Sequence, residues 1–158
     1  LGVSEIIPLE SENCIVQLKG DKAEKKRLRW QGISEAAAKQ SKRSVIPVIA
    51  PVSTWKEAFS LVKNAEIKLI PYENEKGIGF TKEELLRVEE LGEKSGGMIA
   101  LCIGPEGGFS KEEVEEAKKE GFLPISLGKR ILRTETAAIT ALSLIMMHLE
   151  FGEDKEAR

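Results

Sequence analysis

Two short loops hold the residues whose types and spacing could bind a ligand. The first covers residues 104–108, reads GPEGG and directly follows the apolar run 98–103. The second covers residues 127–135, reads LGKRILRTE and follows the apolar run 123–127. Proline fixes one backbone angle and glycine permits positive φ, so the first loop can approach a bound molecule closely. Neither loop matches GxGxxG or GxxxxGK[ST], so the spacing indicates neither a dinucleotide nor a nucleoside triphosphate.

Both loops follow segments that look like buried strands. A run of roughly four to eight apolar residues between turn residues is typical of a strand in a parallel sheet. Ligands of open parallel sheets bind at the carboxyl ends of the strands, so the two loops are expected to meet there. Ser110 and Glu113 form a capping-box pattern that begins a helix after the first loop. An ordinary strand–turn–helix connection has the same pattern, so spacing alone leaves both interpretations open.

Two motifs carry a resemblance to a known family: IGPEGGFS at 103–110 and LGKRILRTETAA at 127–138. In this order they resemble the RsmE-type ribosomal RNA methyltransferases of the SPOUT class. Upstream matches to the family are Arg29-Trp30-Gln31, Glu35-Ala36-Ala37, Gln40, Arg43 and Pro47, so the resemblance covers nearly the whole chain. It implies methylation of N3 of a uridine in 16S ribosomal RNA, with S-adenosyl-L-methionine as cofactor. It also implies a SPOUT fold with a C-terminal trefoil knot.

The resemblance assigns residues to two binding sites. Those implied to form the cofactor pocket are Leu69, Tyr72, Ile103, Gly104, Pro105, Glu106, Gly107, Gly108, Leu127, Gly128, Ile131, Leu132, Thr136 and Ala137. Backbone groups of the two loops would read the adenine edge, and the apolar side chains of the second loop would pack on its faces. Those implied to contact RNA are Arg29, Gln40 and Arg43. The implied partners are small-subunit ribosomal RNA or the assembled small ribosomal subunit.

The methyl-transfer chemistry leaves the base unassigned. Transfer from a sulfonium requires donor and acceptor to be held in line, and uridine N3 must lose a proton. Arg133 is expected to stabilise negative charge on the uracil oxygens, because a guanidinium stays protonated. Glu135 is either a proton acceptor or a carboxylate at a helix N-terminus. Two other functions use the same pocket: a non-catalytic RNA- or nucleotide-binding module, and a small-molecule enzyme that binds a nucleotide.

The chain alternates strands and helices, which predicts an α/β fold with a mostly parallel sheet flanked by helices. Strands are expected at 6–9, 14–18, 45–50, 68–72, 98–103 and 123–127, and helices at 21–43, 54–63, 81–92, 110–119 and 134–149. Capping-box patterns at Thr54/Glu57 and Thr81/Glu84 predict two helix starts. The length predicts one domain over residues 1–158. The family normally carries an N-terminal RNA-binding barrel domain, which we expect to be absent from this chain.

Charge is spread unevenly over the sequence. The formal net charge is only −2, so the whole chain is no obvious polyanion binder. Residues 19–43 nevertheless carry nine Lys or Arg against three acids, a net of +6, which leaves −8 for the remainder. Such a segment is either a solvated helix face or a surface for phosphate. Arg29, Gln40 and Arg43 are expected to cluster on one face, where they either meet RNA or tie the helix to the sheet.

The cysteines and hydropathy exclude several classes of protein. Cys14 and Cys102 lie far apart without a CxxC motif or a nearby histidine, so neither a metal site nor a disulfide is expected. Cys102 lies in an apolar run and is expected to be a small buried side chain. A signal peptide and an apolar run of about 18 residues are both missing from the sequence, so we expect a soluble, cytoplasmic protein that does not enter membranes.

The last predicted helix has an unusual pattern. Residues 137–149 read AAITALSLIMMHL, with apolar side chains all around the helix axis. A helix of this kind is buried on all sides. One covering surface is expected to be a second copy of the chain, which predicts a homodimer with Ile145 in its interface. His148 is the only histidine and is expected to have a core or interface role.

Overall fold

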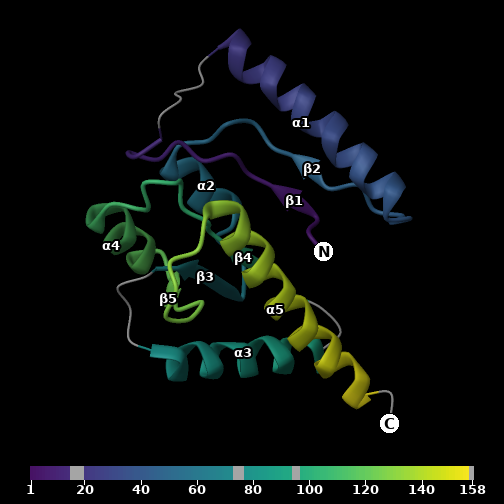
Figure 1. Ribbon diagram of the computed structural model, residues 1–158, viewed down its shortest axis with the longest axis vertical. Coiled ribbons are helices and arrows are strands. Elements are labelled where there is room, and N and C mark those ends of the chain that lie inside the picture. The colour runs from purple at the N-terminus through teal and green to yellow at the C-terminus, as the bar shows by residue number, and fades with distance from the viewer. Residues whose placement is uncertain (15–19, 73–76, 94–96, 157–158) are drawn as a thin grey trace.

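The computed structural model describes residues 1–14, 20–72, 77–93 and 97–156 (Figure 1). Its elements in chain order are β1 (Glu5–Ile6), α1 (Asp21–Gln40), β2 (Val48–Ile49), α2 (Trp55–Leu61), β3 (Ile67–Pro71), α3 (Gly77–Glu93), β4 (Ile99–Leu101), α4 (Lys111–Lys119), β5 (Leu123–Ile125) and α5 (Thr134–Glu156). The prediction of an α/β fold with parallel strands flanked by helices is confirmed.

The described strands form two parallel sheets instead of one. The larger sheet has the order β4-β3-β5, and Leu69 in its central strand pairs with Leu101 on one side and Leu123 on the other. The smaller sheet pairs β1 with β2 and continues into a single bridge between Leu9 and Ser53. The predicted strand at 14–18 lies, except for Cys14, outside the described residues. The carboxyl ends of the three strands of the larger sheet point to the same edge, as expected for a ligand site.

Two of the three predicted helix starts are confirmed. Thr54 caps α2 and Ser110 caps α4, each in a reciprocal capping box with the glutamate three residues on. The predicted start at Thr81 is wrong, because α3 already begins at Gly77. The Thr81 hydroxyl does not cap its own helix. It bonds instead to the backbone of Ser126, just beyond β5.

Alternation along the central strand sorts its side chains into two cores, because successive residues of a strand point to opposite faces. Ile70 packs on one face with Phe59 of α2 and Val114 of α4. Leu69 packs on the other face with Val88 of α3. Helices therefore cover both faces of the larger sheet, with α2 and α4 on one side and α3 and α5 on the other.

Helix α5 is buried on one side by its own chain. Ile145 is only 4% exposed and packs in the core with Leu69 and Val88, so its predicted place in a dimer interface is wrong. The reason is that α3 runs along α5 and covers that side. His148 lies between the two helices, with Nδ1 3.4 Å from the Glu89 carboxylate. Large apolar side chains still face solvent elsewhere on the helix, namely Ile139, Met147 and Phe151.

Helix α1 packs across the smaller sheet, away from the larger one (Figure 1). The Gln31 amide donates to the Pro47 carbonyl and accepts the Ile49 N–H. Arg27 and Ser34 donate to the carbonyls of Ile49 and Pro47. These bonds satisfy the backbone of β2 that β1 does not pair, so polar side chains hold α1 in place.

Candidate functional site

A cavity of about 190 Å³ lies at the carboxyl ends of the larger sheet, between the two glycine-containing loops. Eleven of the fourteen residues assigned to the cofactor pocket line it: Tyr72, Ile103, Gly104, Pro105, Gly107, Gly108, Leu127, Gly128, Ile131, Leu132 and Ala137. The segments that carry them are up to 65 residues apart in sequence, from Tyr72 to Ala137. Parallel strand order brings them together, as the sequence predicts.

The other three assigned residues are not part of the cavity wall. Leu69 is fully buried in the core beneath the cavity, because its side chain points to the α3 and α5 face of the sheet. Glu106 and Thr136 are exposed on the outside of their loop and helix. Strand β3 therefore contributes to the cavity wall only from Pro71 onward.

Sequence reasoning missed several wall residues, namely Phe109, Ser126, Arg130 and Thr134. Phe109 follows the GPEGG loop directly, and its ring lies 5.4 Å from that of Trp55 in an edge-to-face arrangement. Arg130 is the cation of the second loop that lines the cavity. Arg130 and Arg133 lie only three residues apart, and the sequence does not indicate which of them faces the cavity.

The GPEGG loop is held from outside by Asn13. The loop turns at Gly108, whose φ is 69° and whose N–H donates to the Pro105 carbonyl. The Asn13 amide donates to the carbonyls of Gly107 and Gly108 at 3.4 and 3.0 Å. A Cβ at Gly107 would lie 3.0 Å from the Asn13 Cβ, so glycine there also makes room for this clamp. Nothing in the local sequence reveals a partner more than ninety residues away.

Glu113 joins three segments beneath the same loop. Its carboxylate accepts hydrogen bonds from the N–H of Glu12, the N–H of Ser110 and the indole N–H of Trp55, at 2.8, 2.9 and 3.0 Å. Burial by itself raises the pKa of this carboxyl, but these hydrogen bonds outweigh it and hold the pKa of Glu113 below its ordinary value. The side chain is therefore a buried carboxylate with a full set of donors.

Cys102 is the inert neighbour of this carboxylate. Burial, with a smaller contribution from the nearby charge of Glu113, raises the pKa of the Cys102 thiol to about 12. A thiol of this kind is neither a nucleophile nor a metal ligand at neutral pH. The side chain was predicted to be buried, and the structure shows it partly buried against the core that contains Ile70. Among the described residues, no three His, Cys, Asp or Glu side chains are grouped as metal ligands would be.

The two residues proposed for catalysis lie at the start of α5. Arg133 and Glu135 are both exposed and both lie outside the cavity wall. The Arg133 carbonyl accepts the Ala137 N–H as the first turn of the helix forms, and Glu135 follows in that turn. The position of Glu135 fits a carboxylate that stabilises a helix N-terminus. Arg133 stands in sequence between the wall residues Leu132 and Thr134.

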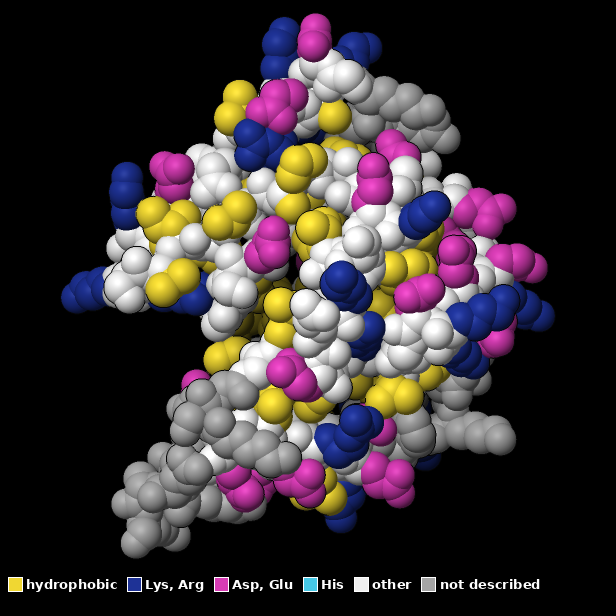
Figure 2. Space-filling model, turned by 180° about the vertical axis from the view of Figure 1, so that it is seen from behind, with side chains coloured by type: hydrophobic (Ala, Val, Ile, Leu, Met, Phe, Trp, Pro, Cys, Tyr) yellow, Lys and Arg dark blue, Asp and Glu magenta, His cyan; other side chains and the backbone are white. Residues whose placement is uncertain are grey.

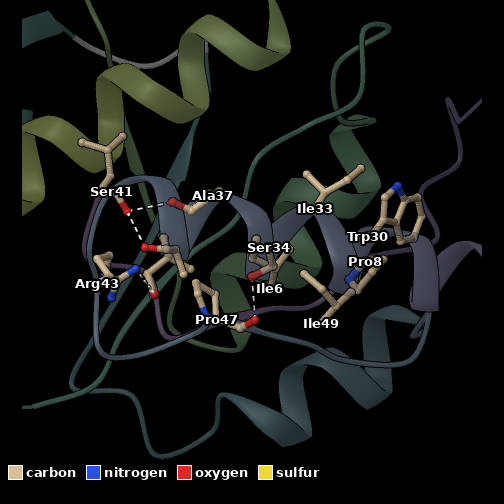
Figure 3. A pocket seen from close by; sticks show the side chains of 13 residues that line it. Ile6, Pro8, Trp30, Ile33, Ser34, Ala37, Ser41, Arg43, Pro47 and Ile49 are labelled. Carbon is tan, nitrogen blue, oxygen red and sulfur yellow. Dashed lines mark hydrogen bonds between the residues drawn. The ribbon is translucent and has the colours of Figure 1, made fainter.

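A second, larger groove of about 530 Å³ is lined on one side by α1 and on the other by the segments around β1 and β2. Figure 3 shows Trp30 and Ile33 of α1 together with Ile6, Pro8 and Ile49 of the N-terminal segments. From behind, hydrophobic side chains line the recess beside the lobe that carries α1 (Figure 2). This groove is mostly apolar, and its polar side chains are those of Ser34, Ser41 and Arg43. Each of the three already donates to a backbone carbonyl, so the groove offers an adenine or an amino acid few partners.

The three residues assigned to RNA contact do not form one cluster. Arg29 and Gln40 are exposed on the same face of α1, but three turns of helix place them about 16 Å apart. Arg43 lies beyond the end of the helix, and its guanidinium donates to the Val3 carbonyl at 3.0 Å. Its observed contact is therefore structural, as in the alternative that the sequence left open, but it joins the end of the helix to the segment before β1 instead of to the sheet itself.

Comparison with known proteins decides the family. The RNA methyltransferase domain model matches residues 1–146. The chain belongs to the RNA methyltransferase domain family. It is 40% identical over 143 residues to ribosomal RNA small subunit methyltransferase E of Mesomycoplasma hyopneumoniae, and 33% identical over 150 residues to the protein of the same name from Bacillus subtilis. These alignments cover 90% and 95% of the chain but 58% of each relative, so the chain spans little more than half their length.

Solved structures of similar fold include methyltransferases with cofactor. The RNA methyltransferase domain superimposes with a TM-score of 0.71 and 36% identity on ribosomal RNA small subunit methyltransferase E from Neisseria gonorrhoeae, solved bound to S-adenosyl methionine. It superimposes with a TM-score of 0.79 and 37% identity on a Legionella pneumophila protein solved with the cofactor SAM. The overlap covers 92% of this chain in both cases, and 55% and 56% of the other chains. These similarities agree with the resemblance found in the two loop motifs.

Proposed function

We propose that residues 1–158 form the methyl-transferring domain of a small-subunit ribosomal RNA methyltransferase. The observation that carries the proposal is the cavity between the GPEGG and LGKRIL loops, at the carboxyl ends of three parallel strands. S-Adenosyl-L-methionine, when bound there, supplies an electrophilic methyl group. The family relatives named as ribosomal RNA methyltransferases support the same conclusion.

The chemistry of the wall fits this cofactor. Gly104, Gly107, Gly108 and Gly128 line the cavity without side chains, so an adenine or a carboxylate can approach the backbone of the two loops closely. Leu127 and Leu132 provide apolar contacts for a ring. The volume is smaller than the roughly 300–1,000 Å³ of most small-molecule sites, so a bound cofactor would fill the cavity and extend beyond its wall. Ile131 on the second loop is 85% exposed, an apolar side chain that a bound ligand would cover.

We propose that the acceptor is N3 of a uridine in 16S ribosomal RNA. Transfer would form a bond from the methyl carbon to N3 and break the carbon–sulfur bond, and the N3 proton would leave to a base. Arg133 stabilises the negative charge that develops on the uracil oxygens. Arg29 and Gln40 on the exposed face of α1 contact the RNA backbone. The trefoil knot remains a prediction that the threading of the last loops in an experimental structure would test.

We propose further that the domain acts as a homodimer through the exposed apolar side of α5. Ile139, Met147 and Phe151 on this helix are 58%, 51% and 48% exposed. Large apolar side chains gathered on one helix mark an interaction surface. The basic segment 19–43 contains α1 and not α5. A dimer formed through α5 therefore leaves this segment available to RNA.

One assay separates this function from its alternative, a binding module without turnover. The domain is incubated with methyl-labelled S-adenosyl-L-methionine and either small ribosomal subunits or extracted 16S RNA. Label in RNA at N3 of one uridine is the expected result. Cofactor binding without any transfer of label to either substrate would favour the non-catalytic RNA- or nucleotide-binding module.

A further inference from the structure

Strand β5 is the edge of the larger sheet, and its backbone groups must be satisfied on both sides. The Ile125 carbonyl accepts the Tyr72 N–H, so the backbone of Ile125 faces β3. Successive residues of a strand direct their backbone groups to opposite sides. The N–H and carbonyl of Ser126 therefore face the open edge, where no strand of the described sheet follows.

A single hydroxyl fills this position. Thr81 Oγ1 donates to the Ser126 carbonyl and accepts the Ser126 N–H, each at 2.9 Å. A hydroxyl can donate and accept at once, so it replaces both bonds that a neighbouring strand would make. Thr81 is 5% exposed, which excludes water as an easy substitute. A threonine inside a helix usually bonds back to its own preceding turn, so this outward pairing is a specific tertiary contact.

The pairing lies where the second loop of the cavity begins. Ser126 itself lines the cavity, and its hydroxyl accepts the Gly128 N–H at 3.3 Å. Gly128 then turns the chain with a φ of 110°. Thr81 thus fixes the backbone of Ser126, and the Ser126 hydroxyl fixes Gly128. Ser126 and Gly128 flank Leu127 at the start of the loop that also carries Ile131 and Leu132.

We propose that Thr81 is a positioning residue for the cofactor site, acting from α3 through the backbone of Ser126. It does not line the cavity. It holds the exit of β5 so that the loop from 127 to 132 is already oriented for the ligand, and preorganisation of this kind increases affinity. The inference rests on the proposed function only in taking the cavity as the site for S-adenosyl-L-methionine.

The test compares two substitutions at Thr81 with a matched control. Thr81→Val keeps the shape but removes the hydroxyl, whereas Thr81→Ser keeps the hydroxyl. Ser34→Ala removes a similar hydroxyl–carbonyl bond, from Ser34 to Pro47, at the distant α1 groove. We expect Thr81→Val to bind S-adenosylhomocysteine about tenfold more weakly by calorimetry, while Thr81→Ser and Ser34→Ala stay within about twofold of the wild type.

Hydrogen exchange provides a readout independent of the ligand. The Ser126 and Gly128 amides should exchange faster in Thr81→Val than in Ser34→Ala at matched thermal stability. Unchanged affinity in a folded Thr81→Val protein, or equal loss in Ser34→Ala, would overturn the proposal. If Thr81→Val does not fold, Thr81→Ala provides the same comparison. Wild-type protein that does not bind S-adenosylhomocysteine would refute the proposed cofactor, and the exchange rates would then decide the role of Thr81 alone.

Discussion

Glu113 shows how one side chain can be both a local cap and a long-range tie. Its pKa is lowered in the folded protein from an ordinary value of 4.5. A lowered pKa contributes stability that is fully present above pH 4.5 and is lost as the pH falls through the folded value. We therefore expect the unfolding free energy of Glu113→Gln at pH 7 to be about 2 kcal/mol lower than that of the wild type. On acidification the unfolding free energy of the variant should fall by less than that of the wild type.

Urea unfolding at pH 7 and at several values below pH 4.5 would measure this difference. Glu112→Gln is the control, because it removes an exposed carboxylate from the same helix. A variant at Glu113 whose acid sensitivity equals that of the wild type would show that its hydrogen bonds do not depend on charge.

The two arginines of the second loop should have different roles, Arg130 in cofactor binding and Arg133 in methyl transfer. Arg130 lines the cavity and Arg133 does not. We expect Arg130→Ala to weaken S-adenosylhomocysteine binding about tenfold. Arg133→Ala should lower single-turnover methylation by roughly 10²-fold, as loss of one transition-state donor does, with cofactor affinity unchanged. Equal loss of binding in both variants would mean that Arg133 only shapes the pocket.

What the sequence could predict at this scale depended on the distance between partners. The caps at Thr54 and Ser110 were predictable, because each bonds a residue three positions away. Thr81 has the same local pattern, yet its partner Ser126 lies 45 residues on. The Asn13 clamp spans more than ninety residues. The residue type determines which groups a side chain can hydrogen-bond, but only the fold determines which distant residue lies close enough to be its partner.

At the scale of elements, α3 and α5 approach so closely that their backbones meet at glycine. A Cβ on Gly152 would contact the Glu89 carbonyl and the Glu93 N–H of α3. We expect Gly152→Ala to destabilise the protein by about 1–3 kcal/mol, since overpacking forces the helices apart. Denaturant midpoints would measure the change.

Gly32→Ala is the matched control for this helix pair. A Cβ at Gly32 on α1 meets nothing within 4 Å, so alanine there should stabilise the protein by up to about 1 kcal/mol through helix propensity. If both substitutions stabilised the protein to the same extent, close packing of α3 against α5 would not be a constraint.

Periodicity predicted which elements exist but not how they are covered. The apolar pattern of residues 137–149 indicated a helix buried on all sides, and the structure covers only part of it, through α3. A pattern shows that a face must be covered but not by which segment, because a neighbour in the same chain and a second copy leave the same signal. Ile145 was misassigned for this reason.

At the scale of the whole molecule, the uncovered side of α5 predicts self-association. We expect sedimentation at micromolar concentration to give a dimer for the wild type and a folded monomer for Met147→Asp. Met147 is 51% exposed in the single chain, so a charge there should destabilise the dimer interface more than the folded monomer. Ile33→Asp, at a 57% exposed position on α1, should leave the dimer intact. A monodisperse wild-type monomer would refute the dimer.

The chain contains two tryptophans, and each lies beside a different cavity. Trp55 packs on Phe109 in the wall of the loop cavity, while Trp30 lines the α1 groove near Lys26. Intrinsic fluorescence can therefore be assigned to one site at a time. In Trp30→Phe protein, the remaining emission reports on the loops as S-adenosylhomocysteine is added. In Trp55→Phe protein, it reports on α1, so quenching by RNA but not by cofactor would locate the RNA surface optically.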